Sequence, residues 1–254
     1  MTLERLPDEL LIELFEYFDA PELFQIFYGL NNRFNTILFD KCRSSHLNFH
    51  SMMKYGYASQ CQSYLRTIVD QIISLRLFGE SNEYPSQMNI FASIGISLEE
   101  FTHLRSVSLL YVNSSDAFSL VLSCYGMPHL THLKVFQSSR PSAIDQNFSN
   151  AVWGLPKLAH FRLKTSDRFS LPTTISVTLT YVSILCDVGD LTLIDGIIRQ
   201  TRSLLYLHIP LNNLNEDHKQ TLPVWPSISM LNLSDVRSFD VMEKVLKSTP
   251  NLTQ

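Results

Sequence analysis

Residues 204–214 read Leu204-Leu205-Tyr206-Leu207-His208-Ile209-Pro210-Leu211-Asn212-Asn213-Leu214, and this stretch contains the pattern that decides the fold. Apolar residues occupy its first, fourth and sixth positions, and an asparagine occupies the ninth. Alternation of this kind predicts a β-strand with one buried face. The same frame recurs along the chain, at Ile72/Leu75/Leu77, Leu104/Val107/Leu109, Leu130/Leu133/Val135, Leu158/Phe161/Leu163 and Ile228/Leu231/Leu233.

The first positions of these frames lie 32, 26, 28, 46 and 24 residues apart. The gap of 46 divides into steps of 16 and 30 if Thr174/Val177/Leu179 is a further strand. Most of these periods are close to the 20–29 residues of leucine-rich repeats, which residues 69–254 resemble in an irregular form. Only one frame has asparagine at the ninth position, so a continuous asparagine ladder is not expected.

Helical periodicity lies between the predicted strands. The helical candidates are residues Ser115–Cys124, Ile144–Trp153, Leu191–Gln200 and Ser238–Lys247. Strands that alternate with crossover helices build a parallel sheet, so the fold class is α/β: a leucine-rich-repeat-like solenoid with the sheet inside and the helices outside. The stretch 249–254 looks like the first third of another repeat, which predicts an array truncated in its last repeat or ended by an imperfect cap.

Residues that alternate with the buried leucines should line the open face of the sheet. At the middle strand position they are Arg76, Ser108, Lys134, Arg162, Thr178, His208 and Asn232. We expect target-protein contacts from Arg76, His132, Lys134, Phe136, His160, Arg162, Lys164, Tyr206 and His208. Such cations and imidazoles favour an acidic or phosphorylated segment. The alternative is that they are ordinary solvated strand positions.

The N-terminus has a different pattern, Leu6-Pro7-Asp8-Glu9-Leu10-Leu11-Ile12-Glu13-Leu14-Phe15-Glu16-Tyr17-Phe18. Proline fits the first turn of a helix, and Asp8 and Glu9 suit its positive end. Asp19 and Glu22 form a capping-box pattern for a second helix. Gly29 ends that helix, and Asn31-Asn32 offers a cap for a third.

Three short helices cannot hide all of their large apolar side chains, because domains this small bury only about 60% of their surface. Either the neighbouring part of the chain or a partner must cover the remainder. Both explanations are open from the pattern alone.

Residues 3–42 resemble an F-box, through Leu6-Pro7-Asp8-Glu9-Leu10-Leu11, Ala20-Pro21-Glu22-Leu23, Leu30-Asn31 and Arg33-Phe34. Phe18, where leucine is usual, and Phe34, where tryptophan is common, depart from the family pattern but keep its apolar bulk. The resemblance implies binding to a Skp-type adaptor and through it to a cullin-RING ubiquitin ligase. It also implies adaptor-contacting or supporting roles for Leu6, Pro7, Leu10, Leu11, Leu14, Phe15, Leu23, Ile26, Leu30 and Phe34.

The expected organisation is an F-box at 1–42, a helical connector at 43–68 and the repeat array at 69–254. This organisation predicts a non-catalytic substrate-recognition adaptor that presents a bound target protein for ubiquitination. The alternative is a protein-interaction scaffold without a link to a ubiquitin ligase, in which the helical triplet only caps the array.

Composition argues against other classes of protein. The net charge is −4, and residues 1–45 hold eight acidic and four basic residues. Without a basic block, nucleic-acid binding is not expected. Nucleotide-binding and hydrolase motifs are missing, so neither enzyme activity nor a cofactor is expected. The spacing of Cys42, His46 and His50, with Cys61, could hold zinc, but structural or surface roles are commoner. No signal peptide or apolar span is visible, which predicts an intracellular protein in the cytoplasm or nucleus without membrane contact.

Overall fold

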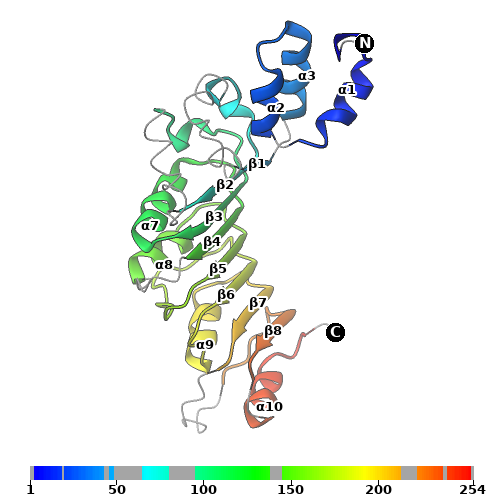
Figure 1. Cartoon of the computed structure of the whole chain (residues 1–254). Helices are drawn as coiled ribbons and strands as arrows, with labels where there is room; N and C mark the ends of the chain where they lie inside the picture. Colours follow the sequence, from blue (N-terminus) through cyan, green and yellow to red (C-terminus); the bar gives the residue numbers. More distant parts are fainter. Residues whose placement is uncertain are drawn as a thin grey trace. The chain divides into compact units, whose positions relative to one another are not determined.

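The computed structural model in Figure 1 describes residues 3–18, 20–42, 46–48, 65–79, 95–137, 145–212, 222–236 and 239–252. The chain is an α/β protein with parallel strands. Its internal contacts define two compact units, one of Met1–Ser108 with Gly126–His129 and the other of Leu109–Tyr125 with Leu130–Gln254. The division falls within strand β3 (Ser106–Val112) and the short 3-10 helix η4 (Cys124–Gly126).

The first unit begins with helices. Its elements are η1 (Leu3–Arg5), α1 (Asp8–Phe15), α2 (Ala20–Phe27), α3 (Asn32–Cys42), β1 (His46–Asn48), η2 (Val69–Gln71), β2 (Ser74–Phe78) and η3 (Leu98–Glu100). Strands β1 and β2 pair in parallel, with Leu47 opposite Leu75. The stretch expected to be a helical connector therefore contributes a strand, while residues 65–68 within it are helical.

The three N-terminal helices form where the sequence predicts them. Pro7 precedes α1 with φ −56°, and two acidic residues occupy the first turn. Gly29 adopts a φ of +81° after α2, a conformation that glycine reaches without steric cost. The Asn31 side chain accepts a hydrogen bond from the Phe34 amide at 3.0 Å and thereby caps α3. The predicted cap at Asp19 lies outside the described residues.

The second unit repeats strand and helix. Its elements are α7 (Ser114–Ser123), β4 (His132–Gln137), α8 (Gln146–Trp153), β5 (His160–Lys164), β6 (Tyr181–Leu185), α9 (Leu191–Arg199), β7 (Tyr206–Pro210), β8 (Met230–Ser234) and α10 (Phe239–Ser248). From β4 to β8, each strand pairs in parallel with the next one along the chain. Helices α7, α8 and α9 lie on one side of the strands (Figure 1). All four predicted helices are confirmed to within two residues at either end.

The predicted strand at Thr174/Val177/Leu179 is wrong, because β6 begins at Tyr181. Leu179 is instead the first position of a frame that continues through Val182 and Ile184, all of them fully buried. With this frame the first positions from Leu104 onward are 26, 28, 21, 25 and 24 residues apart. Backbone hydrogen bonds explain the register of β6. The Ala159 carbonyl accepts hydrogen bonds from the amides of residues 180 and 181, and the carbonyl of residue 180 accepts them from the amides of residues 205 and 206.

The core of the second unit lies between the strands and the helices. Strand residues that are at most 2% exposed include Leu133, Val135, Phe161, Leu163, Val182, Ile184, Leu207 and Ile209. Trp153 of α8 packs edge-on against the Phe161 ring at 5.7 Å and donates a hydrogen bond from Nε1 to Thr201 at 2.9 Å. Burial of these apolar faces is the main stabilising term for the sheet.

Asn212 shows why the ninth position of the frame is an asparagine. Its Oδ1 accepts a hydrogen bond from the Gly189 amide at 2.9 Å, and its Nδ2 donates one to the Asp187 carbonyl at 2.6 Å. A carboxamide supplies both an acceptor and a donor, so one side chain satisfies two groups of the preceding turn. The turn is tight: a Cβ at residue 189 would collide with the Pro210 carbonyl, which explains the glycine.

We predict that Asn212→Ala lowers the free energy of unfolding by about 1–3 kcal/mol, because two backbone groups lose their partner. Asn212→Asp also destabilises, since it keeps the acceptor for Gly189 but cannot donate to the Asp187 carbonyl. Asn232→Ala is the control, since Asn232 is exposed on β8. Urea unfolding followed by circular dichroism measures the three effects. Equal midpoints for Asn212→Ala and Asn232→Ala would contradict the assignment.

Candidate functional site

The helical triplet has an aromatic core of its own. The rings of Phe15 and Phe27 lie 4.7 Å apart, and those of Phe27 and Phe34 lie 5.6 Å apart. Leu11 and Leu23 are also buried. Four of the ten residues expected to contact or support an adaptor, Leu11, Phe15, Leu23 and Phe34, are therefore inside the triplet, where they can only support its surface.

Other predicted adaptor positions face solvent. Leu10 and Ile26 are each 46% exposed and Leu30 is 60% exposed, while Pro7 is also exposed. Leu6 and Leu14 are half-buried. We call Leu10, Ile26 and Leu30 the triplet surface.

Sequence reasoning missed three further exposed apolar residues of this region, Leu3, Ile12 and Tyr17. Tyr17, at 86% exposed, lies in the turn after α1. Helical periodicity from Leu10 would point to it only if the helix continued two residues further.

Arg33 holds the start of the triplet in place. Its guanidinium forms an ion pair with Asp8 and donates hydrogen bonds to the backbone carbonyls of Glu4 and Leu6, at 2.7 and 2.5 Å. These contacts join the N-terminus of α3 to the segment before α1.

The second candidate surface is the side of β4–β8 that faces away from the helices, which we call the open sheet face. Strand register arranges its side chains in rows. The first row is His132, His160, Tyr181, Tyr206 and Met230, and the second is Lys134, Arg162, Ser183, His208 and Asn232. Phe136 and Lys164 begin a third row. Eight of the nine predicted target-contacting residues are thus brought together, whereas exposed Arg76 lies on β2 of the first unit.

Sequence reasoning missed Tyr181 and Ser183, because it placed a strand at 174–179 and assigned Thr178 to the second row. The regular repeat period is the signal that could have found them. A step of 21 residues from Leu158 reaches Leu179, and the strand then follows two residues later.

Rings in the first row stack on one another. The imidazoles of His132 and His160 are 4.3 Å apart and within 4° of parallel, and the phenol rings of Tyr181 and Tyr206 are 4.2 Å apart at the same angle. Between the two pairs, His160 and Tyr181 are 5.4 Å apart with a 32° tilt. The ring faces are therefore largely covered by neighbouring rings.

Cations gather beside this row. The Nζ of Lys134 lies 4.4 Å from the centroid of the Phe136 ring, and the Cζ of Arg162 lies 5.8 Å from it, so one ring supports both charges. Strands β4–β8 contain no aspartate or glutamate. In the described ranges, no carboxylate lies within ion-pair distance of Arg162 or Lys164. The open sheet face is positive, although the chain as a whole is negative.

The electrostatic environment perturbs three groups of this face. Partial burial, and secondarily His160, lowers the pKa of His132 below 6.5. Partial burial, and secondarily Arg162, lowers the pKa of His208. Burial raises the pKa of Tyr181, with a further contribution from its hydrogen bond with Tyr206. At neutral pH these groups are uncharged hydrogen-bonding groups beside the Lys134 and Arg162 cations.

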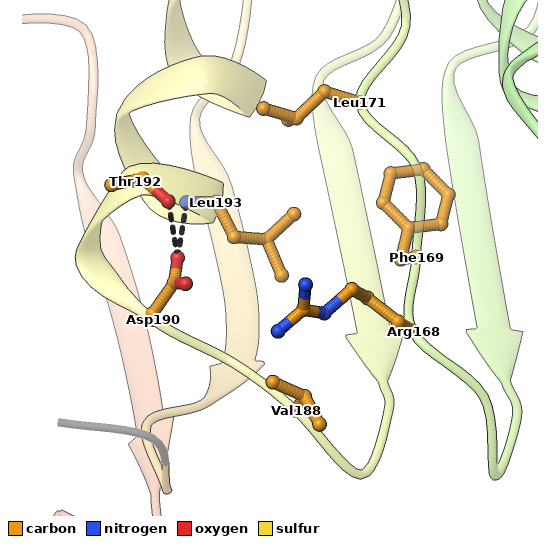
Figure 2. A pocket seen from close by; sticks show the side chains of 7 residues that line it. All are labelled: Arg168, Phe169, Leu171, Val188, Asp190, Thr192 and Leu193. Carbon is orange, nitrogen blue, oxygen red and sulfur yellow. Dashed lines mark hydrogen bonds between the residues drawn. The ribbon is translucent and has the colours of Figure 1, made fainter. Parts of the chain in front are cut away.

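A small cavity of about 170 Å³ lies elsewhere in the second unit (Figure 2), lined by Arg168, Phe169, Leu171, Val188, Asp190, Thr192 and Leu193. Asp190 is the N-cap of α9: it accepts hydrogen bonds from the Leu193 amide at 2.8 Å and from the Thr192 hydroxyl at 2.6 Å. Its carboxylate is thus engaged in capping, and the lining includes no histidine, cysteine or serine. The Thr192 hydroxyl and the Asp190 carboxylate bond to each other at the start of α9, so both belong to the cap of that helix.

Comparison with models of protein families, with curated proteins and with solved structures finds no match for the chain. Among the described residues, no helix is long and apolar enough to cross a membrane. The same part of the chain contains no cluster of three or more potential metal ligands, and the side chains of Cys42, His46, His50 and Cys61 lie outside it. The functional interpretation therefore rests on the triplet surface and the open sheet face.

We predict that NMR titration of the imidazole protons gives His132 and His208 pKa values below 6.5. Arg162→Gln raises the pKa of His208, because it removes a nearby cation, and His160→Asn raises that of His132. Since the unfolded chain takes up these protons first as the pH falls, the stability from both groups is complete above pH 6.5 and declines below it. If the pKa of His208 is unchanged in Arg162→Gln and the pKa of His132 is unchanged in His160→Asn, the assigned electrostatic contacts are wrong.

Proposed function

We propose that the chain is a non-catalytic substrate-recognition adaptor of a ubiquitin ligase. In this proposal the F-box-like triplet docks on a Skp-type adaptor, which connects it to a cullin-RING ligase, and the leucine-rich-repeat-like array holds a target protein for ubiquitination. The observation that carries the proposal is the exposure of Leu10, Ile26 and Leu30 on a triplet whose aromatic core is already complete.

Exposed leucines and isoleucines are common one at a time, but three from one small helical module favour an interaction site. The remainder of the chain leaves these three side chains about half exposed. A partner that covered them would gain roughly 25 cal/mol for each Å² of apolar surface removed from water. The internal core and the Arg33 contacts pre-organise the surface, so little ordering entropy is lost on binding.

An adaptor of this kind needs no catalytic residues of its own. Holding two reactants together replaces a bimolecular encounter, and proximity alone accelerates transfer. The open sheet face would then select the target, while the triplet surface would connect it to the ligase. An intracellular location follows from the proposed partners.

A protein-interaction scaffold is the second candidate. The burial of Leu11, Phe15, Leu23 and Phe34 within the triplet is equally compatible with it, because a helical module that merely caps the strands would have the same core. The two candidates differ in whether the triplet surface has a partner.

We predict that a purified Skp-type adaptor retains the full chain in a pull-down, and that the double variant Leu10→Asp with Leu30→Asp lowers retention about tenfold or more, since two buried carboxylates would be desolvated in the complex. The matched control is Phe239→Asp, which places the same charge on an 82% exposed residue of α10. Substitution at these exposed positions leaves the start of α1 intact. Failure of the wild-type chain to bind would reject the ligase link and favour the scaffold.

A further inference from the structure

The open sheet face is polarised from one strand to the next. Its cations, Lys134, Arg162 and Lys164, all belong to β4 and β5, and the next three strands contain neither cation nor carboxylate. At the far end, Met230 of β8 is 53% exposed. One end of the face therefore suits an anion, and the other suits an apolar side chain.

We propose that this face binds a phosphorylated segment of the target, with the phosphoryl group at Arg162 and Lys164, two exposed cations of β5, and an apolar side chain at Tyr206 and Met230. The bound segment would run roughly perpendicular to the strands, from the second row at Arg162 to the first row at Tyr206 and Met230. The identity of this segment as part of a target for ubiquitination rests on the proposed function. The chemistry by which the face binds a phosphorylated segment does not depend on that function.

The stacked rings decide between a phosphoprotein and a nucleic acid. Proteins that bind single-stranded nucleic acid offer open aromatic faces on which bases stack. Here His160 stacks on His132 and Tyr181 stacks on Tyr206, and the two inner rings approach each other at 5.4 Å with a 32° tilt. The two inner rings therefore offer a ligand mainly their edges, and the edges of imidazole and phenol carry N–H and O–H groups. Such a row hydrogen-bonds to oxygen atoms and does not stack on bases.

The groups around Arg162 suit a phosphoryl group better than a carboxylate. Arg162 is close enough to His208 and Tyr181 to affect the pKa of both. Ser183 is only 1% exposed, so its hydroxyl, 3.3 Å from Nδ1 of His208, can position that ring but does not face a ligand. Cations and neutral donors therefore surround one point of the face. A phosphate monoester has close to two charges and three acceptor oxygens, whereas a carboxylate has one charge and two oxygens.

The strand spacing sets the distance between the two subsites. Neighbouring strands lie about 4.8 Å apart, and Tyr206 and Met230 lie one row, about 6.6 Å along the strands, from Arg162. Tyr206 is therefore about 12 Å and Met230 about 16 Å from Arg162. An extended peptide advances about 3.3 Å per residue. The apolar side chain of the ligand should therefore lie about four or five residues from the phosphorylated one.

The test uses the full chain and immobilised short peptide libraries that differ only at a fixed central residue: phosphoserine, phosphotyrosine, glutamate or serine. An oligouridylate is the nucleic-acid probe. We expect capture by a phosphorylated library about tenfold or more above the serine and glutamate libraries, since charge-assisted hydrogen bonds discriminate by this factor. Selected peptides should have an apolar residue about four or five positions from the centre.

Variants assign the two subsites. Arg162→Glu with Lys164→Glu should abolish the preference for phosphate, whereas Lys157→Glu, an exposed cation of the same unit, should keep it. Met230→Asp should remove the apolar preference and leave phosphate binding intact.

The adaptor-site variant Leu10→Asp with Leu30→Asp should bind the libraries like the wild type, so failure of adaptor docking is distinguishable from failure at this face. Equal capture of all libraries, no capture, preference for glutamate, or oligouridylate binding that is lost in the Arg162 variant would each overturn the proposal.

Discussion

The candidate surface of the second unit depends on one constraint, the twofold alternation of side chains along each strand. Because Leu207 and Ile209 of β7 are buried against the core, Tyr206 and His208 must point to the other face. Because the neighbouring strands pair in parallel with their apolar frames aligned, the same alternate positions point away from the core on each of them. The rows of the open sheet face, such as the one in which Lys134 lies beside Arg162, therefore follow from the buried frame. No further interaction is needed to align them.

The buried frame also concentrates charge. Parallel neighbours bring side chains from distant parts of the sequence within about 5 Å of each other, so Lys134 and Arg162 become adjacent despite being 28 residues apart. Two like charges at that distance repel each other, and their shared contact with the Phe136 ring offsets part of this repulsion. Strands β4–β8 contain no carboxylate that would neutralise the charge of Arg162 and Lys164 on this face. The N-terminal triplet differs from the sheet because its aromatic core is internal. Its exposed apolar residues therefore contribute little to the packing of the triplet itself.

Much of the fold could be predicted, because the local signals and the tertiary structure agree. Helix α9 begins where Asp190 offers a cap, and β5 occupies the strand that the Leu158 frame predicts. The prediction failed at β6, where the β-branched run from Thr173 to Thr178 has local strand propensity but Leu179, not Thr174, occupies the first frame position. It also did not foresee strand β1, whose three residues are too short for a periodic pattern and are strands only because β2 lies beside them.

By itself the sequence determined the α/β class, the order of strands and helices, and the division of apolar residues between frame and open positions, because hydrophobic periodicity records which side of each element is buried. Only the tertiary structure decided which members of an apolar set stay exposed, since Leu10 and Leu11 are alike in sequence and differ only in which neighbours cover them. It also decided the stacking of His132 on His160 and the proximity of Arg162 to His208. The buried frame predicts the row in which each of these residues lies. Which side chains of neighbouring strands touch, and how their rings are oriented, depends on packing across the sheet, which no local pattern records.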